Sequence, residues 1–249
     1  MKIKTGRLIL LEGISSGKTM QAKVAAMRIA DLGHRIACDA EPTSGPFGRV
    51  IRAVIEKRLG DVPCIEANTA AAKLLADKPE VRDRVASVLR TISGRQPVSV
   101  LGMQIIFMAD RLWHCVNVLR PRLADGENII CDRYSPSTFA FGLAHGVELG
   151  DLAHWHYRVL GKSYVTPALT VYMALPPEVA AERFAKDGKV KNVFETEEGI
   201  KRTAAAYEKV WEFGSDTHYF GPIELVDGNK PIPKVGDAIF SKIRRVLAA

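Results

Sequence analysis

The feature that most constrains this chain is the stretch LILLEGISSGKTMQAK at residues 8–23, where a short apolar run leads through a glycine-rich turn into a helical pattern. Phosphate-binding loops have this layout and read GxxxxGK followed by Ser or Thr. Here only three residues separate Gly13 from Gly17, so counting back from Lys18 puts Glu12 where the first glycine is expected. The pattern therefore indicates either an accidental match or a shortened phosphate-binding loop.

The residues on either side of the turn favour a working loop. Residues 7–12 are typical of a strand buried in a parallel sheet, and the segment after Thr19 has helical periodicity up to Gly33. Such a turn points backbone N–H groups and the positive end of a helix at one place, where a polyphosphate can bind. Lys18 would add a charge for the outer phosphates, and the Thr19 hydroxyl could ligate magnesium. An ordinary turn rich in Gly and Ser stays open as the alternative.

Four further strand-like runs follow along the chain, separated by long segments with helical periodicity. This alternation predicts a parallel sheet with helices on both faces. Such sheets bind ligands at the carboxyl ends of their strands, so the residues after each run are candidates for the site. The runs span residues 34–40, 127–133, 169–175 and 222–228.

Two of these strand ends carry residues suited to phosphate chemistry. After the second run, EPTSGPFGRVIR combines a turn at Glu41 with a helix that carries Arg49 and Arg52. After the third run, Asp132 could hold magnesium or its waters while Arg133 clamps a phosphate with two hydrogen bonds. A surface ion pair at a strand end would also place these two residues side by side, so the dipeptide alone leaves both interpretations open.

The helical stretch IIFMADRLWH places Phe107 and Arg111 four residues apart, and hence on one face of a helix. An aromatic ring and a guanidinium in this arrangement could stack on a base and hydrogen-bond its edge. More often, such a Phe belongs to the core and such an Arg is solvated.

The composition is that of a globular α/β protein of 249 residues. The net charge of +7 would suit either nucleic acid or a small anionic substrate, and the lack of a basic cluster interleaved with aromatic residues makes nucleic acid the weaker option. The four cysteines form no CxxC pair, which argues against a zinc site and indicates buried thiols in a reducing cytosol. No stretch is long and apolar enough for a signal peptide or a membrane span, so we expect a cytoplasmic protein.

Taken together and in this order, the segments resemble the thymidylate kinase family of nucleoside monophosphate kinases. LEGISSGKTMQ is similar to the family's EG-x-[DE]-G-x-GKTTQ, and EPTSGPFGRVIR is similar to its EP turn followed by PxGxxIR. FMADRLWH is similar to FAADRxxH, GENIICDRYSPSTFAF to G-x-x-VICDRYxxSxxAY, and LTVYMALPPEVAAER to LTxxLDVxPEVAxxR. The resemblance runs from about Gly6 to Tyr207.

The resemblance implies a P-loop NTPase-type three-layer α/β sandwich, in which a parallel five-stranded sheet has helices on both faces and a lid segment. It implies transfer of the γ-phosphate of ATP to dTMP with Mg²⁺, in an enzyme that commonly forms homodimers. The chain would be one domain over residues 1–249, with extra helix at about 60–98 and the lid at about 183–197. A catalytically impaired nucleotide-binding protein of the same fold, with a regulatory or interaction role, is the alternative.

The resemblance also assigns roles to the residues that match the family's motifs. Phe107 would stack on thymine and Arg111 would bond its O4 edge, while Thr19 and Asp132 would ligate the metal. The expected catalytic residues are Lys18, Asp132, Arg133, Lys189 and Lys191. ATP would contact Gly13, Ser15, Ser16, Gly17, Lys18 and Thr19, and dTMP would contact Glu41, Phe107, Arg111, Arg133, Ser137 and Phe141.

The chain departs from the family's pattern at several positions. The acidic loop residue that contacts the sugar 3′-hydroxyl falls near Ser15, the arginine before the EP turn is Ala40, and the Gln that many members place after the AY pair is Gly142. In the lid, where arginine is common, the chain has Arg183 followed by Lys186, Lys189 and Lys191, and lysine lacks the bidentate fork of arginine. Because no basic side chain lies between the loop's glycines, we expect Lys189 or Lys191 to reach the β- and γ-phosphates when the lid closes. A solvated charge run is the alternative.

Overall fold

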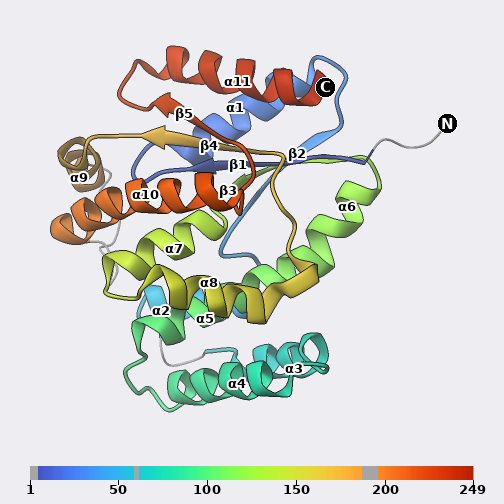
Figure 1. The fold of residues 1–249 in the computed structure, drawn as a ribbon, viewed down its shortest axis with the longest axis vertical. Coiled ribbons are helices and arrows are strands. Elements are labelled where there is room, and N and C mark those ends of the chain that lie inside the picture. The colour runs from blue at the N-terminus through green and yellow to red at the C-terminus, as the bar shows by residue number, and fades with distance from the viewer. Residues whose placement is uncertain (1–4, 59–61, 187–195, 249) are drawn as a thin grey trace.

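The computed structural model describes residues 5–58, 62–186 and 196–248. Within these residues, five parallel strands form one sheet in the order β2-β3-β1-β4-β5, and helices pack on both of its faces (Figure 1). The predicted fold class is therefore confirmed, and each expected run matches a strand to within two residues at either end. The strands are β1 (Leu8–Glu12), β2 (Ile36–Ala40), β3 (Asn128–Asp132), β4 (Leu169–Ala174) and β5 (Ile223–Asp227).

Strand β1 lies in the middle of the sheet, between β3 and β4. Its side chains are all buried, as expected for a strand that is covered on both faces. Leu8 and Leu10 point into the core on one side of the sheet, while Ile9 and Leu11 point into the core on the other side. Because Leu11 is paired with Asp132, β1 and β3 end side by side, at the edge where parallel sheets bind ligands.

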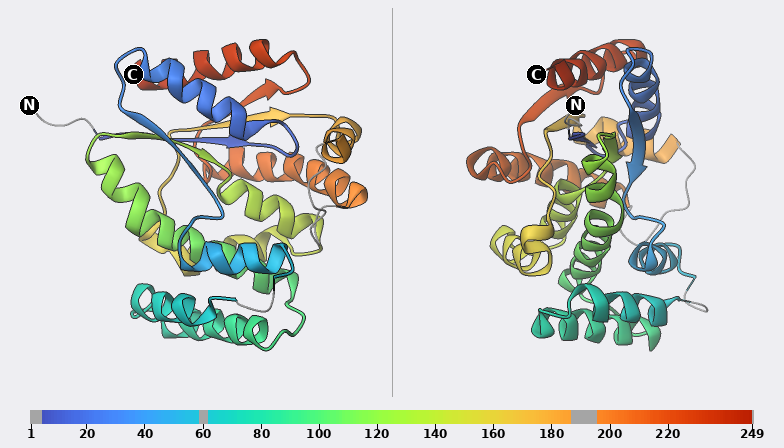
Figure 2. Two further views of the ribbon diagram at one scale, coloured as in Figure 1. Left: turned by 180° about the vertical axis from the view of Figure 1, so that it is seen from behind. Right: turned by 90° about the vertical axis from the view of Figure 1, so that its right-hand side faces the viewer.

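The two faces of the sheet carry different sets of helices. Helices α1 (Lys18–Ala30) and α11 (Ile232–Ala248) cover one face, and α5 (Val100–His114), α7 (Ser135–Ala144) and α10 (Glu197–Thr217) lie on the other (Figures 1 and 2). Apart from two helices described below, the other elements are α2 (Pro46–Ile55), a π-helical turn (Cys115–Leu119), α6 (Arg120–Ala124), α8 (Leu149–Leu160), a 3-10 turn (Gly161–Ser163) and α9 (Pro177–Lys186).

Residues 60–98, where the sequence indicates extra helix, contain a hairpin of two helices, α3 (Cys64–Leu74) and α4 (Pro79–Ser93). The hairpin packs below α2 and α5, at the end of the molecule opposite α11 (Figure 2). Its buried residues Ala67, Val85 and Leu89 belong to the same hydrophobic cluster as Leu8 of the sheet. The hairpin therefore extends the core on the α5 side of the sheet.

One expectation from composition needs correction. Cys64, Cys115 and Cys131 are buried as expected, but Cys38 is exposed, because it lies on β2 at the edge of the sheet. No helix in the described part of the chain is both long and apolar enough to cross a membrane.

Candidate active site

The glycine-rich loop joins β1 to α1 at the carboxyl end of the sheet. Gly13, Ser15 and Gly17 have φ angles of 129°, 49° and 76°, and such positive values are easy for glycine and uncommon for serine. These turns bring Gly17 to the N-cap of α1. The N–H groups of the first helical turn have no carbonyl ahead of them in the helix, and the helix dipole adds to their attraction for anions. The shortened loop thus keeps the strand, turn and helix arrangement of a phosphate site.

Lys18 lies at the start of α1 and folds back over the loop. Its side chain is buried, and Nζ donates a hydrogen bond of 2.5 Å to the carbonyl oxygen of Gly13. The ammonium group is therefore held at the mouth of the turn, where an anion bound by the loop would meet it.

Glu12 occupies the position where the first glycine was expected, and it is fully buried. Its Oε1 accepts a hydrogen bond of 2.7 Å from the N–H of Tyr134, and its Oε2 accepts from the hydroxyls of Ser137 at 2.7 Å and Tyr207 at 3.0 Å. Burial raises the pKa of Glu12, and the Ser137 hydrogen bond and the charge of Arg133 act in the opposite direction. One carboxyl group therefore joins the ends of β1 and β3, helix α7 and helix α10.

Thr19 and Asp132, which the resemblance assigns to a metal, are in direct contact. The Thr19 hydroxyl donates to Asp132 Oδ2 at 2.5 Å, whereas Asp132 Oδ1 is buried with no hydrogen-bond partner among the described residues. In the same residues, no cluster of three or more His, Cys, Asp and Glu side chains could enclose a metal. Mg²⁺ commonly binds through one or two protein oxygens together with waters and substrate phosphates, so this pair of residues fits that ion.

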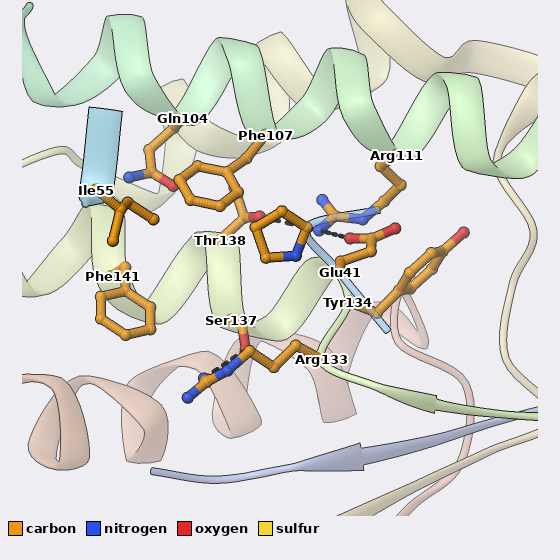
Figure 3. Close-up of a pocket in the computed structure, with 11 residues that line it drawn as sticks. Glu41, Ile55, Gln104, Phe107, Arg111, Arg133, Tyr134, Ser137, Thr138 and Phe141 are labelled. Carbon is orange, nitrogen blue, oxygen red and sulfur yellow. Dashed lines mark hydrogen bonds and ion pairs between the residues drawn. The ribbon is translucent and has the colours of Figure 1, made fainter. Parts of the chain in front are cut away.

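Arg133 follows directly in a left-handed turn with a φ of 70°, a conformation that disfavours most residues other than glycine. Its N–H donates to the carbonyl of Leu11 at 3.2 Å, and the next N–H in the chain is the one bound by Glu12. Nη1 donates to Ser137 Oγ at 3.3 Å, and the guanidinium carbon lies 5.7 Å from the centre of the Phe141 ring. These contacts hold the guanidinium beside the cavity described next (Figure 3).

A cavity of about 200 Å³ opens beside α5 and α7, near the carboxyl ends of β2 and β3 (Figure 3). Phe107 and Arg111 both line it, as their spacing of four residues predicted for one helix face. The structure brings all six expected dTMP contacts to this cavity, namely Glu41, Phe107, Arg111, Arg133, Ser137 and Phe141. Its other lining residues are Pro42, Ile55, Gln104, Tyr134 and Thr138.

Arg111 is buried in the wall of the cavity. Its Nη2 donates to Glu41 Oε2 at 2.6 Å and to Thr138 Oγ1 at 3.0 Å, while the guanidinium carbon lies 4.8 Å from the centre of the Tyr134 ring. A buried charge needs a partner of this kind, and Glu41 supplies it. The ion pair fixes one edge of the guanidinium and leaves its Nε and Nη1 groups, both buried, without a hydrogen-bond partner among the described residues.

His114 completes the charge network behind this wall. Its Nδ1 lies 3.0 Å from Glu41 Oε1, and its Nε2 lies 3.5 Å from Asp39 Oδ2. Burial acts to lower the pKa of His114, but the carboxylates of Asp39 and Glu41 outweigh it and raise that pKa to about 9. His114 is therefore a cation at neutral pH and balances the two acids beside Arg111.

Sequence reasoning did not find several of these contributors. His114 lies three residues after Arg111, and this helical spacing was a usable signal. In the sequence, Glu12 stands out only because it occupies the place of the loop's first glycine. Tyr207 gave no local signal at all, since it reaches the site from helix α10.

Most of the expected lid, including Lys189 and Lys191, lies outside the described residues. Arg183, at the edge of that segment, is on α9, where Nη1 donates to the carbonyl of Gly228 at 3.0 Å and Nη2 donates to Asn229 Oδ1 at 3.3 Å.

A parallel sheet with a glycine-rich loop between its central strand and the next helix is the arrangement of P-loop nucleotide-binding proteins, and here two arginines line a cavity at the same edge of the sheet. The model of the thymidylate kinase family matches residues 65–235, and the chain belongs to this family. The chain is 27% identical to a probable thymidylate kinase of Pyrococcus horikoshii, over 97% of this chain and 98% of the relative. It is 29% identical to a thymidylate kinase of Xanthomonas campestris, over 81% of this chain and 70% of the relative. It is 25% identical to a thymidylate kinase of Bordetella petrii, over 96% of this chain and 95% of the relative.

Proposed function

We propose that this protein transfers the γ-phosphate of ATP to dTMP, giving ADP and dTDP. The observation that carries the proposal is the cavity itself, which is lined by the Phe107 ring, the buried Arg111 and Arg133, and Arg133 lies next to the end of β1, where the phosphate-binding loop begins. The three relatives named above, all described as thymidylate kinases, support the same substrate.

The cavity suits dTMP as the phosphate acceptor. Thymine would stack on Phe107, and its O4 would accept a hydrogen bond from Arg111, whose Nε and Nη1 have no partner among the described residues. A buried donor left unpaired costs about 1–3 kcal/mol, so a ligand carbonyl at this point would be favoured. The phosphate of dTMP would then bind Arg133, whose planar fork matches phosphate oxygens.

The loop suits ATP as the phosphate donor. Residues 13–19, including Ser15 and Ser16, would surround the polyphosphate with N–H groups, and Lys18 would neutralise its outer charge. Mg²⁺ bound with ATP would be held by Thr19 and by the unpartnered Oδ1 of Asp132, and it supplies charge neutralisation on the phosphates.

Phosphoryl transfer needs positioning and charge neutralisation more than covalent chemistry from the protein. An oxygen of the dTMP phosphate forms a bond to the γ-phosphorus while the bond from that phosphorus to the ADP oxygen breaks. Lys18 and Arg133 both act to lower the pKa of Glu12, so both positive charges lie near one buried carboxyl. In this arrangement Lys18 faces the donor phosphates and Arg133 the acceptor phosphate.

The proposal also covers the lid, for which the argument comes from the sequence alone. Lys189 and Lys191 would come over the phosphates when a lid at about 183–197 closes. We further propose that residues 1–249 act as one kinase domain in the cytoplasm and pair as a homodimer by analogy with the family.

A coupled assay of ADP release, with ATP, Mg²⁺ and a panel of nucleoside monophosphates, tests the proposal. We expect dTMP to give the highest kcat/KM in the panel. ADP release that does not depend on any monophosphate, or no release at all, would contradict the proposal and favour an impaired nucleotide-binding protein.

A further inference from the structure

Gln104 carries a buried carbonyl that the protein leaves unpaired. The residue is on α5, it is 3% exposed, and it lines the same cavity as Phe107. Its Oε1 atom is buried and has no hydrogen-bond partner in the described parts of the chain. Buried polar groups are nearly always paired, so an unpaired one in the wall of a ligand cavity indicates a partner on the ligand.

The neighbours of Gln104 show which kind of ligand this is. Gln104, Phe107 and Arg111 lie along one side of α5, with Phe107 between the other two (Figure 3). Arg111 contributes buried N–H donors without a partner among the described residues, and Gln104 contributes an acceptor in the same condition. A flat ring that covers Phe107 would therefore meet donors from one residue and an acceptor from the other.

Gly142 makes room for this side chain. A Cβ atom at position 142 would lie 2.7 Å from Leu152 Cδ2 and 3.3 Å from Gln104 Cγ. Any larger residue there would press on α8 and on Gln104. Gln104 thus fills the space that a longer side chain on α7 would need.

We propose that Gln104 is a specificity-determining residue for the base: its Oε1 accepts the N3–H of a pyrimidine imide while Arg111 donates to the neighbouring O4. This inference rests on the proposed function, because it names the groups that select the acceptor nucleotide. Thymine and uracil present a donor at N3 next to a carbonyl at C4. Cytosine presents an acceptor at N3 and an amino donor at C4.

Arg111 makes this selection one-sided. The amide of Gln104 could turn and offer Nε2 to the N3 atom of cytosine, but a guanidinium can only donate. The cytosine amino group would then face the N–H groups of Arg111, and both sets of donors would remain unpaired. dCMP is therefore rejected, and the 5-methyl group that separates dTMP from dUMP plays no part in this contact.

A binding cycle that changes one atom of the ligand and one side chain of the protein tests the proposal. Binding of dTMP and of N3-methyl-dTMP is measured by calorimetry, without ATP, for the wild type and for Gln104→Leu. The two side chains are similar in volume, so the added methyl group meets similar crowding in both proteins, and the difference reports the hydrogen bond. Gln96→Leu, at an exposed position after α4, is the matched control.

We expect methylation of N3 to weaken binding to the wild type by about tenfold or more, since a ligand donor and a buried acceptor both lose their partner. In Gln104→Leu the penalty should fall to about twofold, and dTMP itself should bind about five- to tenfold more weakly than to the wild type. Gln96→Leu should behave as the wild type. Gln104→Glu keeps an acceptor and should keep most of the penalty, which covers the case in which the leucine variant does not fold.

Equal methylation penalties in the wild type and Gln104→Leu would overturn the inference, as would wild-type affinity for dTMP in that variant. The predicted cycle together with no ADP release from dTMP would overturn the proposed phosphoryl transfer alone. No binding of dTMP to the wild type would overturn both.

Discussion

The hydroxyl of Tyr207 donates a hydrogen bond of 3.0 Å to Glu12 Oε2, although the two residues are 195 positions apart in the sequence. Tyr207 also lies 2.9 Å from the hydroxyl of Ser137, which in turn contacts Arg133. Helix α10, which follows the expected lid, is thereby connected both to Glu12, at the start of the glycine-rich loop, and through Ser137 to Arg133. Because Glu12 is buried, the contact cannot be exchanged for water at little cost, so α10 and the loop are positioned together.

Replacement of Lys18 by Ala should remove most of the activity. The ammonium group at the mouth of the loop neutralises charge that develops on the phosphates, and the loss of one such contact costs about 100-fold or more in kcat. Lys23→Ala, on the exposed side of α1, should leave the steady-state rate of ADP release unchanged. An unchanged kcat/KM in Lys18→Ala would remove the basis for the kinase mechanism.

Arg111→Lys should raise the KM for dTMP by about tenfold and leave the KM for ATP near the wild-type value. Lysine keeps a positive charge next to Glu41, and this avoids an unpaired buried carboxylate, but it lacks the fork that can hold both Glu41 and a ligand carbonyl. Arg202→Lys, an exposed position on α10, is the control. An equal loss for both nucleotides would assign Arg111 a structural role only.

His114 predicts how stability depends on pH. Its pKa is raised from 6.5 to about 9 in the folded state, so it stabilises the fold fully below about pH 6.5 and loses this contribution as the pH rises through 9. The contribution of protonated His114 to the free energy of unfolding is on the order of 3 kcal/mol. Asp110, whose pKa burial raises to about 6, titrates below most of this window.

Urea unfolding of the wild type and of His114→Gln at pH 6.5 and 9.5 measures the contribution of His114 directly. The wild type should lose more free energy of unfolding between these two values than the variant does. Equal losses would show that His114 is not charged in the folded protein.

Asp132→Asn should raise the Mg²⁺ concentration needed for half-maximal activity by about tenfold or more, because even indirect contacts to a bound metal contribute that much. The unpartnered Oδ1 is the atom affected. Titration of Mg²⁺ at saturating nucleotide measures the change. Asp125→Asn, an exposed residue that pairs with Arg35, should show the wild-type requirement. A variant that needs no more Mg²⁺ than the wild type would dissociate Asp132 from the ion.

Replacement of both Lys189 and Lys191 by Ala should lower kcat by about tenfold or more, while dTMP binding stays near the wild-type value. The reason is that a charge contact made mainly in the transition state affects the chemical step and not the ground state. Stopped-flow measurement of a single turnover separates the two. Wild-type kcat in the double variant would leave Arg183, or another arginine, as the cation that meets the transferring phosphate.

The parts of the site that sequence reveals are those built from neighbours along the chain. The strand before Gly13 and the helix after it follow from local patterns, and the shared face of Phe107 and Arg111 follows from a spacing of four residues. The order of motifs then indicates the family, because several weak signals in one sequence are far more specific than any single one.

The parts that sequence does not reveal depend on distant residues and on burial. Nothing in the local pattern distinguishes Glu12 from an exposed acid, and its partners come from three other segments. Gln104 reads as an ordinary polar residue in a helix, since only packing against the cavity makes its carbonyl unpaired. Cys38 shows the converse: the composition predicts a buried thiol, but the residue is exposed because its strand lies at the edge of the sheet.

Two different surfaces of helix α5 make contacts that matter for the cavity. One presents Gln104, Phe107 and Arg111 to the cavity, and another packs against the α3–α4 hairpin, where a Cβ at Gly102 would lie 3.5 Å from Val88 Cγ2. Since close-packed helices transmit small displacements, the position of this cavity wall depends on the side-chain volumes inside the hairpin. A substitution that changes the volume of the hairpin's interior should therefore alter the shape of the cavity without touching any residue that lines it.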